Sequence, residues 1–121
     1  MLLCTPNSQW SQAMKYLSRS EEILLLAVWR LRDDAYGVTI QREVKTRTGK
    51  ELSFGALWVS LDALSRKGYL SKTQADPTPK RGGRGKLYYR VTPAGLQALQ
   101  HVRDLQQALW DGLPNFRLQN G

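Results

Sequence analysis

A basic, glycine-rich stretch, RGGRGKLYYRVTPAG, occupies residues 81–95. The interval from Pro79 to Arg90 contains no acidic residue and five cations, namely Lys80, Arg81, Arg84, Lys86 and Arg90. Lysine and arginine bind polyanions by displacing the counterions condensed on phosphate groups. The three glycines at 82, 83 and 85 let the backbone turn and approach a partner closely. The stretch predicts contact with nucleic acid, and a solvated turn is the alternative interpretation.

The charge of the whole chain favours the same class of partner. There are 18 Lys and Arg against 10 Asp and Glu, so 121 residues carry a net charge of +8. This balance favours nucleic acid first and an anionic membrane surface second. The basic stretch lacks the apolar anchors of a membrane-surface segment, and the longest apolar run, residues 23–29, is too short to span a bilayer. We expect a double-stranded DNA partner and no membrane.

Residue types that catalyse reactions or bind metals are scarce. The chain has one cysteine, Cys4, and one histidine, His101, so we expect no metal site. A single cysteine excludes an intrachain disulfide and is typical of a reducing compartment, which indicates a cytoplasmic protein. No nucleophile–base pair, phosphate-binding loop or carboxylate pair has a supporting context. We therefore expect neither an enzyme nor a cofactor.

A β-hairpin is predicted to carry the basic stretch. Residues 69–75 and 86–92 are rich in aromatic and β-branched side chains, which is typical of strands, and turn-forming residues separate them. After the second strand, Thr92 is a predicted N-cap and Pro93 the first residue of a helix that extends to about residue 112. The cations would then lie at the tip of the hairpin.

Helices are predicted before the hairpin. A short one over residues 8–17 precedes a helix capped by Ser18 or Ser20. That helix is apolar on all sides over residues 23–29, so we expect it to be central and Trp29 to lie in the core. The next helix, from residue 37, has Ile40 and Val44 on its apolar face and is predicted to end at Gly49 in a left-handed conformation.

The following helix completes a helix-turn-helix candidate. Ser53 is its predicted N-cap, and its predicted core face consists of Leu57, Leu61 and Leu64. The opposite side carries Gly55 and Val59. Small residues near a helix N-terminus allow close approach to a duplex, because a helix fits the major groove and its first residues reach the base edges. We predict a mostly α fold with a small β-hairpin (α+β), a winged helix-turn-helix.

Three segments together resemble the PadR family of bacterial transcriptional regulators, and the resemblance covers roughly residues 19–110. They are YGVTIQREV (36–44), LSFGALWVSLDALSRKGYL (52–70) and RGGRGKLYYRVTPAGLQAL (81–99). The resemblance implies that helix 53–67 reads DNA, that residues 80–86 form the tip of a basic wing, and that the last helix makes a homodimer. It further implies a sequence-specific DNA-binding regulator, a repressor on a palindromic operator.

The resemblance and the helical pattern together assign candidate DNA contacts. Trp58 stands where the family commonly has tyrosine, so its indole N–H can donate a hydrogen bond to a phosphate but cannot accept one. Tyr36 stands at a family histidine position, and Val38 replaces a family tyrosine. The candidate DNA contacts are Tyr36, Thr39, Ser53, Phe54, Gly55, Ala56, Trp58, Val59, Lys80, Arg81, Arg84 and Lys86.

The last helix carries the candidate dimer interface. From Val102 onward its apolar residues are spaced by threes and fours, as in a coiled-coil seam. The predicted interface consists of Leu99, Val102, Leu105, Leu109 and Trp110. The domain organisation that we expect is an N-terminal extension (1–18), a winged helix-turn-helix (19–92), a dimerisation helix (93–113) and a tail (114–121).

Two alternatives stay open at this point. In some members of the family, aromatic residues between the paired helices form a pocket for flat hydrophobic molecules, so Trp110 could mark an effector site near the dimer interface. Otherwise it packs against the partner's first helix or N-terminal segment. A winged helix can also serve protein or RNA contacts.

Overall fold

The computed structural model describes residues 16–74 and 86–114. Three of the candidate wing contacts, Lys80, Arg81 and Arg84, therefore lie outside the described residues, as does most of the helix predicted over 8–17. Residues 16–18, at the end of that segment, form no regular structure.

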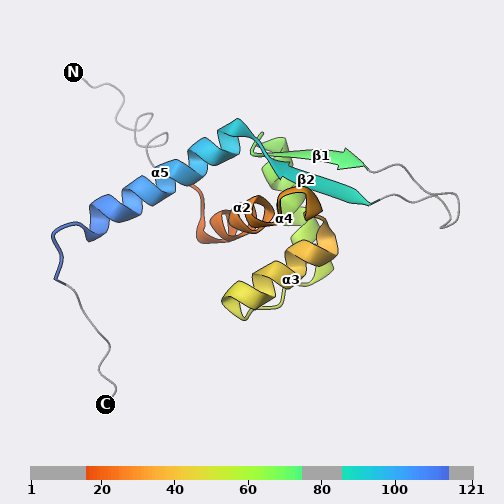
Figure 1. The fold of residues 1–121 in the computed structure, drawn as a ribbon, viewed down its shortest axis with the longest axis horizontal. Coiled ribbons are helices and arrows are strands. Elements are labelled where there is room, and N and C mark those ends of the chain that lie inside the picture. Colours follow the sequence, from red (N-terminus) through yellow and green to blue (C-terminus); the bar gives the residue numbers. More distant parts are fainter. Residues whose placement is uncertain (1–15, 75–85, 115–121) are drawn as a thin grey trace, which may run out of the picture.

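The described chain is mostly helical with one two-stranded antiparallel hairpin, which confirms the predicted fold class (Figure 1). The helix over 93–112 ends two residues earlier than predicted, at Trp110. No helix in the two described ranges is long and apolar enough to cross a bilayer. The elements are α2 (Arg19–Leu31), the 3-10 turn η1 (Arg32–Asp34), α3 (Gly37–Thr48), α4 (Phe54–Arg66), β1 (Leu70–Gln74), β2 (Leu87–Val91) and α5 (Pro93–Trp110).

Helices α2, α4 and α5 begin at predicted caps, and α2 uses Ser18, the first of its two candidates. The Ser18 hydroxyl accepts a hydrogen bond from the Glu21 backbone N–H, while the Glu21 carboxylate accepts one from the Ser18 N–H. Ser53 and Thr92 accept in the same way from N–H groups in the first turns of α4 and α5. Each hydroxyl satisfies a donor that has no partner within the helix. Helix α3 ends as predicted at Gly49, whose φ of +77° is left-handed.

The hairpin is attached to the start of α3. Strand β1 pairs with β2 in a register that places Leu70 opposite Val91 and Gln74 opposite Leu87. Strand β2 also contacts the segment before α3, because the Tyr89 N–H donates to the Ala35 carbonyl at 2.9 Å. This attachment holds the base of the predicted wing against the helix-turn-helix.

The core lies between α2, α3, α4 and the hairpin. Helix α4 buries the three predicted leucines, and α3 buries Ile40 and Val44, as the helical spacing indicated. The buried hydrophobic cluster consists of Leu24, Leu25, Ala27, Val28, Ala35, Ile40, Val44, Leu57, Leu61, Leu64, Leu70, Tyr89 and Val91.

Helix α2 is central to the core as expected, but the expectation that Trp29 lies in the core was wrong. Leu26 and Trp29 are exposed, and the Trp29 side chain, at 37%, lies outside the core cluster. The Arg32 guanidinium lies 4.3 Å from the centre of the Trp29 ring, in cation–π geometry. The apolar run surrounds the helix, but the other described elements cover only one side of it.

Close packing at the start of α5 yields a stability prediction. A Cβ at Gly95 would lie 2.4 Å from the Tyr69 carbonyl oxygen and 2.8 Å from Val91 Cγ1. Because a backbone atom cannot move aside cheaply, Gly95→Ala should destabilise the fold by about 1–3 kcal/mol. Thermal unfolding followed by circular dichroism should show Tm lower by roughly 4–8 °C per kcal/mol. The exposed Gln97→Ala is the control, and an unchanged Tm in Gly95→Ala would contradict this contact.

Candidate nucleic-acid interface

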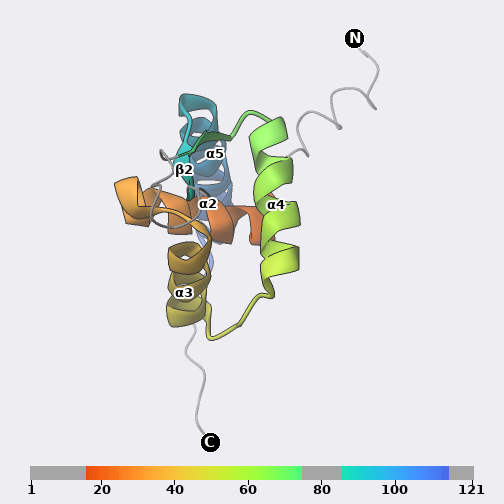
Figure 2. The ribbon, with the colours of Figure 1, turned by 90° about the vertical axis from the view of Figure 1, so that its right-hand side faces the viewer.

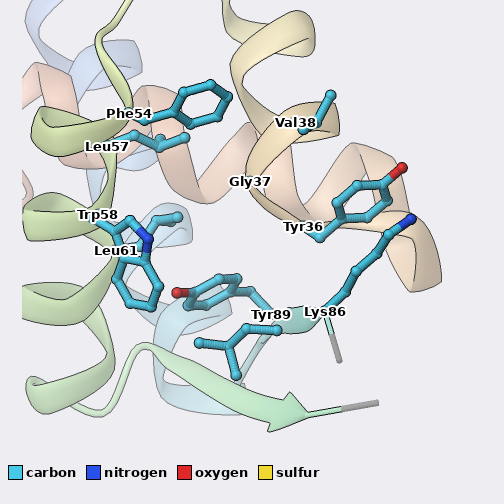
Figure 3. A pocket seen from close by; sticks show the side chains of 10 residues that line it. Tyr36, Gly37, Val38, Phe54, Leu57, Trp58, Leu61, Lys86 and Tyr89 are labelled. Carbon is cyan, nitrogen blue, oxygen red and sulfur yellow. The ribbon is translucent and has the colours of Figure 1, made fainter. Parts of the chain in front are cut away.

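Three elements that carry or adjoin residues assigned to DNA contact converge on one cavity of about 280 Å³ (Figure 3). The start of α3, the first two turns of α4 and the beginning of β2 each form part of its wall. Four candidate contacts from the sequence, Tyr36, Phe54, Trp58 and Lys86, therefore lie around the same opening. The complete lining is Tyr36, Gly37, Val38, Phe54, Leu57, Trp58, Leu61, Lys86, Leu87 and Tyr89.

Helix α4 presents its N-terminal half to the surface. Figure 2 shows α3 and α4 beside each other, joined by the short connection before Ser53. The Gln41 side-chain amide donates to the Leu52 carbonyl at 2.6 Å and ties that connection to α3. Since the predicted leucine face of α4 is buried, the opposite face points away from the core. The candidate contacts Ser53, Phe54, Gly55, Ala56, Trp58 and Val59 are all exposed.

Tyr36 and Lys86 join the helix pair to the hairpin. The Lys86 Nζ lies 4.2 Å from the centre of the Tyr36 ring, a cation–π arrangement that keeps the ammonium at the surface. The Tyr36 and Tyr88 rings meet edge to face with centroids 5.3 Å apart. The strand pattern did not identify Tyr88 as part of this site, because its partner lies 52 positions earlier in the sequence.

The assignment of Thr39 to DNA contact was wrong. Its side chain is buried, with 8% of the residue exposed. Its hydroxyl accepts from the Tyr36 N–H at 2.9 Å and donates to the Asp34 carbonyl at 2.5 Å. Thr39 therefore caps the start of α3 and positions Tyr36, and its hydroxyl is not available to a phosphate or a base.

The one acidic residue of α4 is compensated by neighbouring cations. Asp62 accepts hydrogen bonds from Arg66, at 2.5 and 3.1 Å, and from Lys72 of β1 at 3.2 Å. The hydrogen bonds from Arg66 and then Lys72 lower the pKa of Asp62 below its usual value. The carboxylate stays ionised but is balanced locally, which limits its repulsion of a polyanion.

Tyr89 forms the floor of the cavity. Its ring is buried, and its hydroxyl points toward Trp58 in Figure 3. Burial first, and the nearby Asp62 charge second, raise the pKa of the Tyr89 phenol. The phenol is therefore protonated at neutral pH and adds no negative charge to this surface.

The predicted seam on α5 is divided between the core and the surface. Val102 is only 5% exposed within the single chain, and Leu99 packs against the core cluster. Val102 therefore leaves little area for a partner within the predicted interface, because the chain itself already covers this side chain. Toward the end of α5, Leu109 and Trp110 are exposed, and so is Leu113 beyond it.

A second hollow, of about 560 Å³, lies between α2 and α5. Leu26 and Trp29 line it from α2, and Leu96 and Leu99 line it from α5. Polar side chains of both helices, including Glu22 and Arg103, complete the wall. Within residues 16–74 and 86–114, no three His, Cys, Asp or Glu side chains are grouped closely enough to hold a metal ion.

Comparison with known protein families identifies one class of protein, the transcriptional regulators. Residues 25–101 match the model of the "Transcriptional regulator PadR-like family". No protein of curated function matches the chain significantly.

Solved structures share the fold. H. salinarum RosR is 25% identical, with a TM-score of 0.66 and 83% of each chain covered. A PadR-like transcription factor from Bacteroides fragilis is 21% identical, with a TM-score of 0.64, covering 85% of this chain and 89% of that one. A winged-helix DNA-binding protein from STIV is 18% identical, with a TM-score of 0.61, covering 81% of this chain and 98% of the other.

Proposed function

The chain belongs to the PadR-like family of DNA-binding transcriptional regulators, and from this premise we propose that it is a homodimeric repressor of a palindromic operator. In this proposal, α4 enters the major groove and the basic wing (residues 80–86) contacts the phosphate backbone. The family consists of regulators and not of enzymes. We further propose that the protein works in the cytoplasm, in agreement with its single cysteine.

The convergence of α3, α4 and β2 on one surface carries this proposal. The exposed start of α4 lies beside Tyr36 and Lys86, so a duplex against α4 would also reach the base of the wing. Recognition helices use their N-terminal residues in this way, while flanking cations hold the register through phosphates.

The exposed apolar residues at the end of α5 support a dimer. Leu109, Trp110 and Leu113 leave most of their area accessible in the single chain. The hollow between α2 and α5 adds the exposed Leu26 and Trp29. Exposed apolar patches are typical of an interface with another protein, and a second copy of the chain would bury these residues with twofold symmetry.

The deciding experiment is a selection of genomic DNA fragments by the purified protein at two salt concentrations. We expect a palindrome with half-sites about one helical turn apart, as a twofold dimer requires. Binding that is weakened by salt but shows no motif would contradict an operator-specific repressor. It would favour the alternative in which the winged helix serves protein or RNA contacts.

The wing should contribute to DNA affinity through its positive charge and should not discriminate between base sequences. The triple variant Arg81→Ala, Arg84→Ala, Lys86→Ala should bind all duplex sequences more weakly by a similar factor. The slope of log affinity against log salt concentration should lose about 0.9 for each phosphate contact removed. Arg19→Ala, at an exposed position at the start of α2, is the control for the loss of one positive charge away from the wing. An unaltered slope in the triple variant would exclude the wing from the DNA interface.

The hollow beside Trp29 favours one second candidate, a regulator released from DNA by a small hydrophobic effector. This position differs from the site near Trp110 that the sequence indicated. We rank it second because a second copy of the chain would cover the same residues. Screening planar hydrophobic compounds by tryptophan fluorescence, together with release of the operator, tests it. Quenching without release would argue against regulation.

A further inference from the structure

The exposed face of α4 has almost no capacity for hydrogen bonding to bases. The segment from Ser53 to Leu61, SFGALWVSL, contains no Arg, Lys, Asn, Gln, Asp or Glu. These are the side chains that make bidentate contacts with guanine, adenine and cytosine in the major groove. The residues that the structure exposes in the first two turns are Phe54, Gly55, Ala56, Trp58 and Val59.

Several polar groups around this face already have structural partners. The Ser53 hydroxyl accepts from the Ala56 N–H at 3.1 Å, and the Gln41 amide is bonded to the Leu52 carbonyl. In the later turns, Asp62 and Arg66 bind each other. Trp58 directs its side chain over the cavity, toward Tyr89 (Figure 3). The side chains at the start of α4 that remain available to contact bases directly are chiefly apolar.

Val59 is the most prominent of the exposed apolar side chains in α4. It is 71% exposed, and Gly55 and Ala56 lie one turn before it on the same face. Because glycine and alanine project little, the backbone can approach closely and the Val59 methyl groups can reach the groove floor. The feature of the major groove that an apolar side chain recognises is the 5-methyl group of thymine.

We propose that α4 reads its operator by apolar contact between Val59, with Ala56 beside it, and thymine methyl groups. This inference rests on the proposed function, in which α4 lies in the major groove. It predicts a T·A pair beneath Val59 in each half-site. Since the phosphate contacts of the wing carry no base identity, the protein should tolerate changes at many other positions.

The test uses the operator obtained from the genomic selection, synthesised with uracil in place of single thymines. Uracil pairs identically but lacks the methyl group. At one thymine per half-site, uracil should weaken binding about fourfold, the equivalent of one buried methyl group. Cytosine at that position should also weaken binding, and 5-methylcytosine should recover part of the loss.

Two variants connect the effect to Val59. Val59→Ala should lose a similar factor on the thymine operator and show no further loss with uracil at that position. Val59→Ile keeps an apolar side chain and should retain the uracil penalty. The high exposure of Val59 means that neither change should disturb the fold, which thermal unfolding checks.

Uracil operators that bind as tightly as the thymine operator, or a full uracil penalty in Val59→Ala, would overturn the methyl-reading proposal. In both cases the protein would still bind its operator, so the proposed function would stand. If the selection yields no operator, the proposed function itself is wrong and the methyl-reading proposal fails with it.

Discussion

Gly55→Gln should lower the affinity for the operator by about 100-fold or more while leaving the fold intact. In the free protein, a Cβ at Gly55 would meet no atom within 4 Å, and Gly55 does not have a positive φ. Glutamine also has a better helix propensity than glycine, so the free energy of unfolding should rise by roughly 0.5 kcal/mol.

The loss of binding follows from geometry. If the start of α4 lies against the groove floor, the glutamine side chain at position 55, with its five non-hydrogen atoms, moves the backbone away from the bases. Several contacts would then lengthen together, and each good base contact is worth about 1–3 kcal/mol. Fluorescence anisotropy with the selected operator gives the affinity, and thermal unfolding gives the stability.

The matched control is Ala94→Gln, which adds similar bulk to an exposed position in the first turn of α5. It should leave operator affinity within a factor of two or so, as is usual for surface changes that contact nothing. Normal binding by Gly55→Gln would mean that another side of α4 faces the duplex. Loss of the fold in Gly55→Gln would contradict the open space around this residue.

Leu109→Asp should convert the dimer into a monomer. Leu109 is 64% exposed in the single chain, so an aspartate there is solvated and the fold of the monomer is undisturbed. In the proposed dimer the same carboxylate would be buried without a partner, which costs several kcal/mol. Sedimentation velocity should show one species at the mass of a single chain.

Operator affinity should fall with the dimer. A monomer contacts one half-site, so we expect a loss of more than about 100-fold on the palindrome, with little change on an isolated half-site. Ala108→Asp places the same charge at an exposed position of the same helix, on the side away from Trp110. It should remain dimeric. If Leu109→Asp keeps the mass of a dimer, the interface must lie on another surface.

Local features of the chain were predictable from the sequence. The N-caps at Ser18, Ser53 and Thr92 and the left-handed Gly49 each depend on a few neighbouring residues. The leucine face of α4 follows from the helical repeat alone. The sequence therefore determined which segments are helices or strands, where they begin, and that the layout is a winged helix.

What only the tertiary structure decided is which apolar and polar side chains find a partner within the chain. Trp29, Thr39 and Val102 each lie on a face whose pattern fits, but burial depends on which other element covers that face. Thr39 caps α3 because its hydroxyl accepts a hydrogen bond from the Tyr36 N–H, and it is held in place by donating to the Asp34 carbonyl.

The cavity at the candidate nucleic-acid interface was equally beyond the sequence pattern. It joins Tyr36, Trp58 and Lys86, residues up to 50 positions apart. The spacing of apolar residues in the sequence indicates which face of its own helix or strand a side chain occupies. The distance between side chains of different elements is set by how the helices and the hairpin pack. That packing reduces the apolar area that the whole chain exposes to water.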